Sequence, residues 1–284
     1  MATTTDTLDR WLELAIALAR EAGRIQMDGL DRSPEVQHKG PRELVTSIDH
    51  ACEVHIAKRL KAELPDHGLL GEEGHGGEGK AGAPRWIVDP VDGTTNYSRR
   101  LPLFSVSIGL EVPGEGCVLG VVLAPYLDEL FYARRGGGAW KARGQSPPRR
   151  MQVAPTARLA DAVLSTGFAY VLGQTPNKNL DNWAHLSPIT QALRRGGSAA
   201  IDLAYVADGR FDAFWEMHLK PYDVAAGAVL VREAGGRVTD MGLGEDWLEG
   251  QTLIASNGGI HEELARELAP VLPDPWVRVP SRRQ

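Results

Sequence analysis

An apolar run that ends in two aspartates is the feature that most constrains this chain. Residues 86–88, Trp-Ile-Val, are typical of a buried strand, and Asp89 and Asp92 follow them closely. Carboxylate oxygens suit a hard divalent cation such as Mg²⁺, which keeps coordination positions free for a substrate phosphate. Pro90 stiffens the predicted turn between the aspartates and would direct the carbonyl of Val91 at the same ion. The sequence therefore predicts a metal site at the end of this strand.

Gly93 and Thr94 come next and are predicted to begin a helix. The first backbone N–H groups of a helix have no partner within it, so they are able to hold a phosphate oxygen. One continuous segment thus predicts both halves of a metal-dependent phosphoryl-transfer site.

Two further acidic elements lie upstream and downstream of this segment. Glu72 and Glu73 end an apolar stretch, and Asp223 precedes residues 224–231, which are typical of a buried helix whose small side chains allow close packing. If these carboxylates converge with the two aspartates, the site carries about four negative charges and needs cations to be stable. The four are Glu72, Asp89, Asp92 and Asp223.

Each motif also has a simpler interpretation. An Asp-Pro-x-Asp-Gly string on its own is typical of a surface turn. Glu72 with Glu73 is typical of a solvated pair, and Asp223 of a helix N-cap. An N-cap carboxylate can also coordinate a metal, so these interpretations do not exclude a site.

Taken together, the motifs resemble the signatures of the inositol monophosphatase family. The resemblance is carried by Glu72-Glu73, by residues 89–96 and by residues 222–227, and residues 195–200 and 209–216 match in the same order and spacing. Members of this family are magnesium-dependent, lithium-inhibited phosphomonoesterases, and they are commonly homodimers. The resemblance implies an α/β (α+β) fold of the layered αβαβα sandwich type, shared with fructose-1,6-bisphosphatase.

The resemblance also implies a ligand set for two or three Mg²⁺ ions per site. One ion would be held by Glu72, Asp89 and the Val91 carbonyl. A second would be held by Asp89, Asp92 and Asp223, so that Asp89 bridges the two. A third, weaker ion would lie near Glu72.

The roles in catalysis follow from the same resemblance. Thr94, assisted by Asp49, and Glu72 would orient and deprotonate the attacking water. The N–H groups of Gly93 and Thr94 would hold phosphate oxygens. No covalent phosphoenzyme is needed.

The resemblance implies substrate contacts for three more residues, and a fourth is a candidate on a mobile loop. Glu216 would accept hydrogen bonds from substrate hydroxyls, with a structural role as its alternative, and the Ala199 backbone is implied in the same contact. Lys220 stands where some relatives carry histidine, and an ordinary surface lysine is an equal alternative. Lys39 corresponds to a lysine on a mobile loop of the relatives that can approach a metal position.

Thr95, followed by Asn96, favours a substrate of the inositol 1-phosphate type or a similar small polyol or sugar phosphate. Relatives acting on adenosine bisphosphate or histidinol phosphate often carry lysine or arginine directly after the first threonine. Two alternatives stay open. One is a related phosphatase for fructose bisphosphate, dinucleotide phosphate, adenosine bisphosphate or histidinol phosphate. The other is a non-catalytic role in which the same fold binds a protein or RNA partner.

Composition fits an enzyme that needs neither nucleic acid nor a membrane. The chain has 284 residues, 43% of them hydrophobic, and a formal net charge of −6, which argues against general nucleic-acid binding. It has no run of about 18 apolar residues and no signal-peptide pattern at its start. Two cysteines are too few for a disulfide scaffold, so a cytoplasmic location is expected.

The family resemblance implies a single phosphatase domain, residues 1–284, in two halves. The half at 1–145 would carry Glu72, Asp89 and Asp92, and the half at 146–284 would carry Glu216 and Asp223, with a connector at 144–150. Helices are predicted over 8–27, 47–64, 183–193, 198–207 and 223–234. Strands are predicted over 86–88, 104–111, 118–123, 130–132, 139–141, 162–166 and 211–215.

Overall fold

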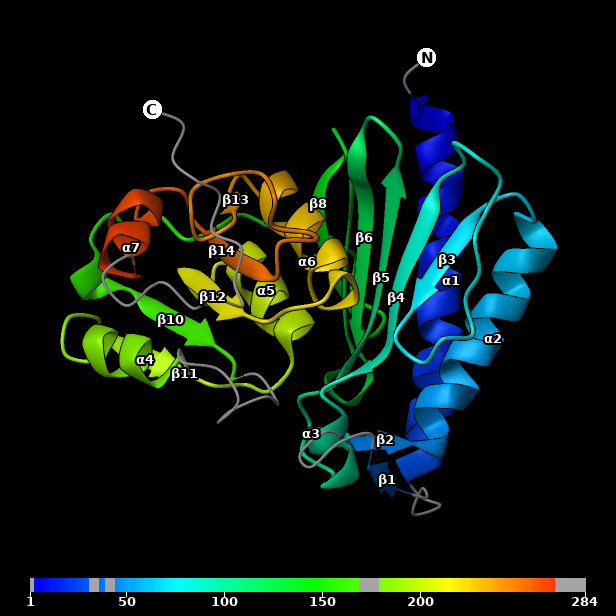
Figure 1. Cartoon of the computed structure of the whole chain (residues 1–284), viewed down its shortest axis with the longest axis horizontal. Helices are drawn as coiled ribbons and strands as arrows, with labels where there is room; N and C mark the ends of the chain where they lie inside the picture. The colour runs from blue at the N-terminus through cyan, green and yellow to red at the C-terminus, as the bar shows by residue number, and fades with distance from the viewer. Residues whose placement is uncertain (1–2, 31–35, 39–43, 169–178, 269–284) are drawn as a thin grey trace.

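The computed structural model describes residues 3–30, 36–38, 44–168 and 179–268. These residues form five layers in the order helices, sheet, helices, sheet, helices (Figure 1). The layered αβαβα sandwich that the family resemblance implies is therefore confirmed. No helix among the described residues is both long and apolar enough to cross a membrane.

The larger sheet is a meander of seven strands that follow one another in chain order. Only the first two, β3 and β4, run parallel, and every later pair is antiparallel. The strands are β3 (Gly68–Gly71), β4 (Arg85–Asp92), β5 (Ser105–Val112), β6 (Gly116–Ala124), β7 (Glu129–Arg134), β8 (Gly138–Arg143) and β9 (Arg149–Arg150). Because β9 pairs with β8, the end of the predicted connector at 144–150 belongs to this sheet.

Two long helices cover the outer face of this sheet, α1 (Thr5–Leu30) and α2 (Ser47–Glu63) (Figure 1). On α1 the buried Ala15, Leu18, Ala19 and Ala22 recur at helical spacing and meet the sheet through a shared apolar core. Burying a leucine such as Leu18 completely contributes about 2 kcal/mol. A two-stranded ladder of β1 (Val36–His38) and β2 (Leu44–Thr46) leads into α2.

The second sheet has five strands in the order β11-β10-β12-β14-β13. They are β10 (Val163–Thr166), β11 (Ala192–Arg194), β12 (Ala213–Met217), β13 (Arg237–Thr239) and β14 (Thr252–Ser256). Its outer face carries α4 (Leu180–Leu186) and α7 (His261–Leu268). Three short helical turns complete the described elements: α3 (Thr94–Ser98), η1 (Pro125–Leu127) and η2 (Leu159–Asp161).

The middle layer consists of α5 (Ala199–Ala207) and α6 (Pro221–Glu233), which lie between the two sheets (Figure 1). Helix α6 is buried from Val224 to Val231, and its small residues let it lie directly on the larger sheet. A Cβ atom added at Gly120 of β6 would lie 2.2 Å from the carbonyl oxygen of Ala226. This close packing sets the position of Asp223 in the first turn of α6.

Two of the predicted elements are wrong in extent. The helix predicted over 183–193 ends at Leu186, because Pro188 has no N–H with which to continue the helical hydrogen bonds, and Ala192–Arg194 instead form β11 against β10. The predicted turn between Asp89 and Asp92 is a bulge inside β4, since the pairing with β5 continues to Asp92 with a shift of register. The strand β3 pairs with β4 only as far as Val88, so Pro90 blocks no hydrogen bond on that side.

The packing of α6 on the sheet predicts an asymmetry between two glycine-to-alanine substitutions. Gly120→Ala should destabilise the fold by about 1–3 kcal/mol, because the new methyl group meets helix backbone that cannot move alone. Gly77→Ala is the matched control, since a Cβ at that glycine has no atom within 4 Å. Denaturant unfolding of both variants measures the difference, and equal free energies of unfolding would contradict this account of the packing.

Candidate active site

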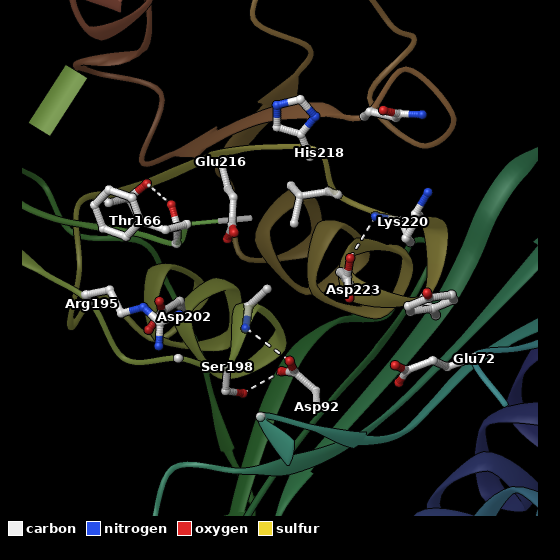
Figure 2. A pocket seen from close by; sticks show the side chains of 18 residues that line it. Glu72, Asp92, Thr166, Arg195, Ser198, Asp202, Glu216, His218, Lys220 and Asp223 are labelled. Atoms are coloured by element: carbon white, nitrogen blue, oxygen red, sulfur yellow. Dashed lines mark hydrogen bonds between the residues drawn. The ribbon is translucent and has the colours of Figure 1, made fainter. Parts of the chain in front are cut away.

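Seven of the sequence-predicted residues line one cavity of about 300 Å³ between the two halves of the chain: Glu72, Asp92, Gly93, Ala199, Glu216, Lys220 and Asp223. Asp49, Asp89, Val91 and Thr94 are not part of its lining. Its lining comes from the ends of four elements: Glu72 after β3, Asp92 at the end of β4, Ser198 before α5 and Asp223 at the start of α6 (Figure 2). Glu216 of β12 lines the same cavity. The first two residues come from the larger sheet and the others from the second half of the chain.

Asp92 joins the two sides of the cavity through the N-terminus of α5 (Figure 2). One of its carboxylate oxygens, Oδ2, accepts hydrogen bonds from the Ser198 hydroxyl and from the N–H of Ala200 at 2.8 Å. The other oxygen accepts from the N–H of Ala199 at 3.3 Å. A negative charge at this end of a helix is favourable, because unpaired N–H groups point toward it.

Asp89 is buried at the bulge of β4, with 3% of its surface exposed, and one of its oxygens accepts a hydrogen bond from Val91 N–H at 3.0 Å. Burial raises the pKa of Asp89 well above its ordinary value, and the nearby carboxyls of Glu72, Asp92 and Asp223 raise it further. The four predicted carboxyl groups therefore lie close enough to repel one another.

Asp223 occupies the third position of α6 and caps that helix. Its Oδ2 atom accepts a hydrogen bond from the backbone N–H of Lys220 at 2.7 Å. Burial raises the pKa of Asp223 to about 8, and the charges of Asp92 and Glu72 act in the same direction. Its capping role and its place in the acidic cluster coexist.

Thr94 and Asp49 form the pair that the family resemblance implies. The Thr94 hydroxyl lies 3.1 Å from Asp49 Oδ1 and 3.1 Å from the Val91 carbonyl oxygen. The second oxygen of Asp49 accepts from the hydroxyl of Thr46 at 2.5 Å and from its N–H at 2.9 Å, which closes a capping box at the start of α2. The Asp49 carboxylate is thereby fixed from both sides.

Gly93 permits the turn from β4 into α3. Its φ of 93° lies in the left-handed region, and a Cβ there would lie 2.9 Å from the Leu103 carbonyl and 3.1 Å from that of Gly197. Asn96 connects the two neighbouring segments, since its side-chain amide donates to the carbonyl oxygens of Leu103 at 2.6 Å and of Gly196 at 2.9 Å.

Glu216 faces the cavity from β12 at the side opposite Asp92 (Figure 2). Burial raises the pKa of Glu216 well above its ordinary value, Asp223 and Asp202 raise it further, and the Arg195 guanidinium opposes them. Ala199 and Lys220 also line the cavity, and the Lys220 side chain is exposed. Lys39 lies outside the residues that the structure describes.

Several lining residues received no role in the sequence analysis. Ser198 had a usable signal, because a serine before an apolar helical stretch is a typical N-cap. Asp202 had another, since it is a lone charge within the otherwise apolar α5, where it is 3% exposed. His218 and Gln251 had no local signal, because only the tertiary fold brings them to the cavity.

The acidic cluster fits a hard cation in its chemistry. Its donors are carboxylate oxygens that lie close together, which is the type of ligand that magnesium prefers. Among the described residues, no three His, Cys, Asp or Glu side chains are already arranged so that they could hold a metal ion. In this arrangement Asp92 accepts a hydrogen bond from α5, and Asp223 accepts one from Lys220.

Comparison with known proteins places this geometry in a family. The inositol monophosphatase family matches residues 7–272. Inositol-1-monophosphatase of Rhizobium meliloti (strain 1021) is 41% identical over 94% of this chain and 93% of its own. Nus factor SuhB of Pasteurella multocida (strain Pm70) is 39% identical over 93% of this chain and 97% of its own.

Solved structures agree with the sequence matches. The inositol monophosphatase of Anabaena (Nostoc) sp. PCC 7120 has a TM-score of 0.83 and 38% identity, covering 94% of this chain and 98% of its own. The extragenic suppressor protein suhB of Bartonella henselae has a TM-score of 0.84 and 38% identity, covering 91% and 98%. The chain belongs to the inositol monophosphatase family.

Proposed function

We propose that this chain is a magnesium-dependent phosphomonoesterase that hydrolyses inositol 1-phosphate or a similar small polyol or sugar phosphate. Membership of the family supports a phosphatase. The observation that carries the finer proposal is the convergence of four carboxyls beside the turn at Gly93. A cluster of like charges is unstable alone, and bound cations would relieve the repulsion and in turn hold a phosphate.

Magnesium is the proposed cofactor, in two or three ions per site. Glu72, Asp89 and the Val91 carbonyl would hold one ion, and Asp92 and Asp223 would join Asp89 around another. When bound, magnesium would neutralise charge on the phosphoryl oxygens and lower the pKa of a coordinated water.

The protein's own groups would then prepare the attack. The Thr94 hydroxyl, held by Asp49 and the Val91 carbonyl, would orient the water, and Glu72 would accept its proton. A bond forms from the water oxygen to phosphorus while the bond to the alcohol oxygen breaks, and the alcohol leaves with a proton from solvent. The N–H groups of Gly93 and Thr94 would hold phosphate oxygens in line for this displacement.

The alcohol would bind on the side of the cavity that faces away from the acidic cluster. Glu216 would accept hydrogen bonds from its hydroxyl groups, and the backbone of Ala199 would do the same. Lys220 lies at the rim, where a cation favours an anionic substrate.

Two further parts of the proposal rest on the family resemblance: a homodimeric assembly and inhibition by lithium. A cytoplasmic location is proposed from the low number of cysteines. A related phosphatase for fructose bisphosphate, dinucleotide phosphate, adenosine bisphosphate or histidinol phosphate is the nearest alternative.

A second candidate function is a non-catalytic binding role for a protein or RNA partner. It is favoured by relatives named Nus factor SuhB from Pasteurella multocida, Pseudomonas aeruginosa and Vibrio cholerae, which are 38–39% identical to this chain. The intact acidic cluster favours catalysis, since a binding role alone would not require four repelling carboxyls.

Phosphate release from a panel of phosphomonoesters tests the proposed function. With millimolar Mg²⁺, inositol 1-phosphate should be hydrolysed faster than fructose bisphosphate, adenosine bisphosphate or histidinol phosphate. Activity should vanish in excess chelator and return with added Mg²⁺. Full turnover in chelator would reject the metal mechanism, and no turnover on any ester would favour the binding role.

The raised pKa values predict how magnesium affects stability at different pH. A carboxyl whose pKa rises on folding binds its proton more tightly in the folded chain, so the metal-free protein loses stability as pH increases. For Asp223 the window runs from its ordinary value of 3.8 to about 8. Saturating Mg²⁺ should therefore raise Tm by about 3 °C or more at pH 8 and by less at pH 5.5.

Scanning calorimetry with chelator or Mg²⁺ at both pH values measures this effect. Asp223→Asn is the control, because it removes one charge at nearly constant shape and should raise the metal-free Tm at pH 8 while weakening the response to Mg²⁺. A response to Mg²⁺ that is equal at both pH values, or unchanged in the variant, would contradict the assignment of Asp223 to the cation site.

Glu216→Gln separates substrate recognition from the metal chemistry. Loss of an acceptor for substrate hydroxyls should lower kcat/KM for inositol 1-phosphate by about tenfold, and should lower it less for an aryl phosphate that lacks those hydroxyls. Steady-state kinetics on both esters decides the role. Equal losses would assign Glu216 to the metal site or to the fold.

A further inference from the structure

Two histidines from different elements face each other outside the cavity. His50 lies in the first turn of α2, and His75 lies in the segment that follows β3. His50 Nδ1 is 3.1 Å from His75 Nε2, and the two rings are almost perpendicular, with an angle of 83° between their planes. Both residues are exposed, and a carboxylate oxygen of Glu73 lies 3.8 Å from the same Nδ1. Neither histidine belongs to the lining of the cavity.

A buried glutamate sets the position of the backbone that carries His75. Glu53 follows His50 by about one turn of α2 and is fully buried. One of its carboxylate oxygens accepts the N–H of Glu73 at 2.7 Å, and the other accepts the N–H of His75 at 2.7 Å. Gly71 leaves room for this contact, because a Cβ atom there would lie 2.3 Å from the Glu53 carboxyl carbon. The segment after β3 is thereby fixed to the part of α2 that carries His50.

The same segment is also closed at its base. The backbones of Leu69 and Gly77 exchange two hydrogen bonds, of 2.9 and 3.0 Å, so residues 70–76 form a short loop. The approach of the two imidazoles therefore follows from backbone contacts and does not depend on their own hydrogen bond. A ligand that used both rings would find them in place, so little of its binding free energy would be lost in ordering them.

The spacing of the two nitrogens is close to that in a tetrahedral metal site. Nitrogen ligands about 2.0–2.1 Å from Zn²⁺, at the tetrahedral angle, lie about 3.3–3.4 Å apart. The 3.1 Å between His50 Nδ1 and His75 Nε2 needs only a small rotation of the rings to reach this value. Binding would replace the hydrogen bond between the rings. The ring that donated it would change tautomer, with its proton carried on its other nitrogen, so that both rings stay neutral.

These nitrogen donors select a different cation from the acidic cluster. Imidazole suits Zn²⁺, Cu²⁺ and Ni²⁺, whereas Mg²⁺ prefers oxygen. The carboxylate of Glu73 beside His50 Nδ1 adds a negative charge that favours a cation. The part of the chain that the structure describes has no three His, Cys, Asp or Glu side chains already arranged around an ion, so water would complete the coordination by the two histidines.

We propose that His50 and His75 form a binding site for one borderline divalent ion, represented by Zn²⁺, that is separate from the proposed magnesium site. The bound ion would join the first turn of α2 to the loop that carries Glu72 and Glu73. The assignment is independent of the phosphatase function, because it rests on the two imidazoles and on the backbone contacts that position them.

Isothermal titration calorimetry with Zn²⁺ tests the site, with millimolar Mg²⁺ present throughout to compete for the carboxylates of the cavity. The parent should bind one Zn²⁺ per chain through the two histidines. His50→Gln and His75→Gln should each weaken this binding by about tenfold or more, because loss of a group that only supports a metal ligand already weakens binding by about 10–100-fold. Zn²⁺ should raise the Tm of the parent, and neither variant should show the same rise.

His185→Gln is the matched control. His185 is an exposed histidine beside a carboxylate, since its Nε2 lies 2.8 Å from Glu267 Oε2, but its partner is not a second imidazole. Its Zn²⁺ affinity should stay within about twofold of the parent, since most exposed substitutions have small effects. In chelator, all three variants should keep the Tm of the parent for the same reason.

Three results of the titration would overturn the site. Zn²⁺ binding that both histidine variants retain in full would assign the ion to the carboxylates of the cavity or to another place. A loss in only one of the two variants would exclude coordination by both nitrogens. Absence of Zn²⁺ binding by the parent would leave the pair as a hydrogen bond between two surface histidines.

Electron paramagnetic resonance of the parent with one equivalent of Cu²⁺ gives a readout that does not depend on the variants. Hyperfine coupling to two imidazole nitrogens would support the site, and coupling to fewer than two would reject it. Because neither measurement uses a phosphate ester, failure of the proposed phosphatase function would leave this result unchanged.

Discussion

Repulsion among four clustered carboxyl groups, of which Asp89 and Asp92 are buried and Glu72 and Asp223 half-buried, is the constraint around which the site is organised. Asp89 lies within the electrostatic reach of Glu72, Asp92 and Asp223, and burial makes that repulsion stronger than it would be in water. The fold relieves it only in part. Asp92 is stabilised by the N-terminus of α5 and Asp223 by the N–H of Lys220, whereas Asp89 receives one hydrogen bond from Val91. The charge that remains favours the binding of cations between the two halves of the chain.

Close packing in the middle layer brings the carboxylates of the two halves of the chain together. Helix α6 lies on β5 and β6 because glycines of the sheet face alanines of the helix. A Cβ at Gly109 would lie 2.8 Å from Ala225, and one at Gly227 would lie 2.5 Å from Leu203 of α5. Larger side chains at these contacts would move the first turn of α6 away from β4 and separate Asp223 from Asp92. The small residues at these contacts therefore determine how close Asp223 lies to Asp92.

Short sequence patterns predict the individual residues of this site better than they predict how the fold arranges them. The carboxylates at 89 and 92, the turn at Gly93 and the helix after Asp223 are all visible as short-range patterns, and the family resemblance supplies their grouping. The bulge at Pro90 was not predicted, because it depends on how far β3 extends alongside β4. The strand Ala192–Arg194 was not predicted either, since its identity comes from pairing with β10 rather than from its own residues. His218 and Gln251 are 33 positions apart in sequence and meet only through the β12–β14 ladder.

The capping box of α2 shows how a structural element far from the cavity takes part in its chemistry. Asp49 is needed to begin α2, since one of its oxygens accepts the N–H and hydroxyl hydrogen bonds of Thr46. Its other oxygen is left facing inward, where it meets the Thr94 hydroxyl. Burial raises the pKa of Asp49, while the hydrogen bonds from Thr46 favour its ionised form. An acceptor fixed by a helix cap cannot rotate away from Thr94, so the direction of the threonine hydroxyl, and of any water that it orients, is set by the same interaction that starts the outer helix.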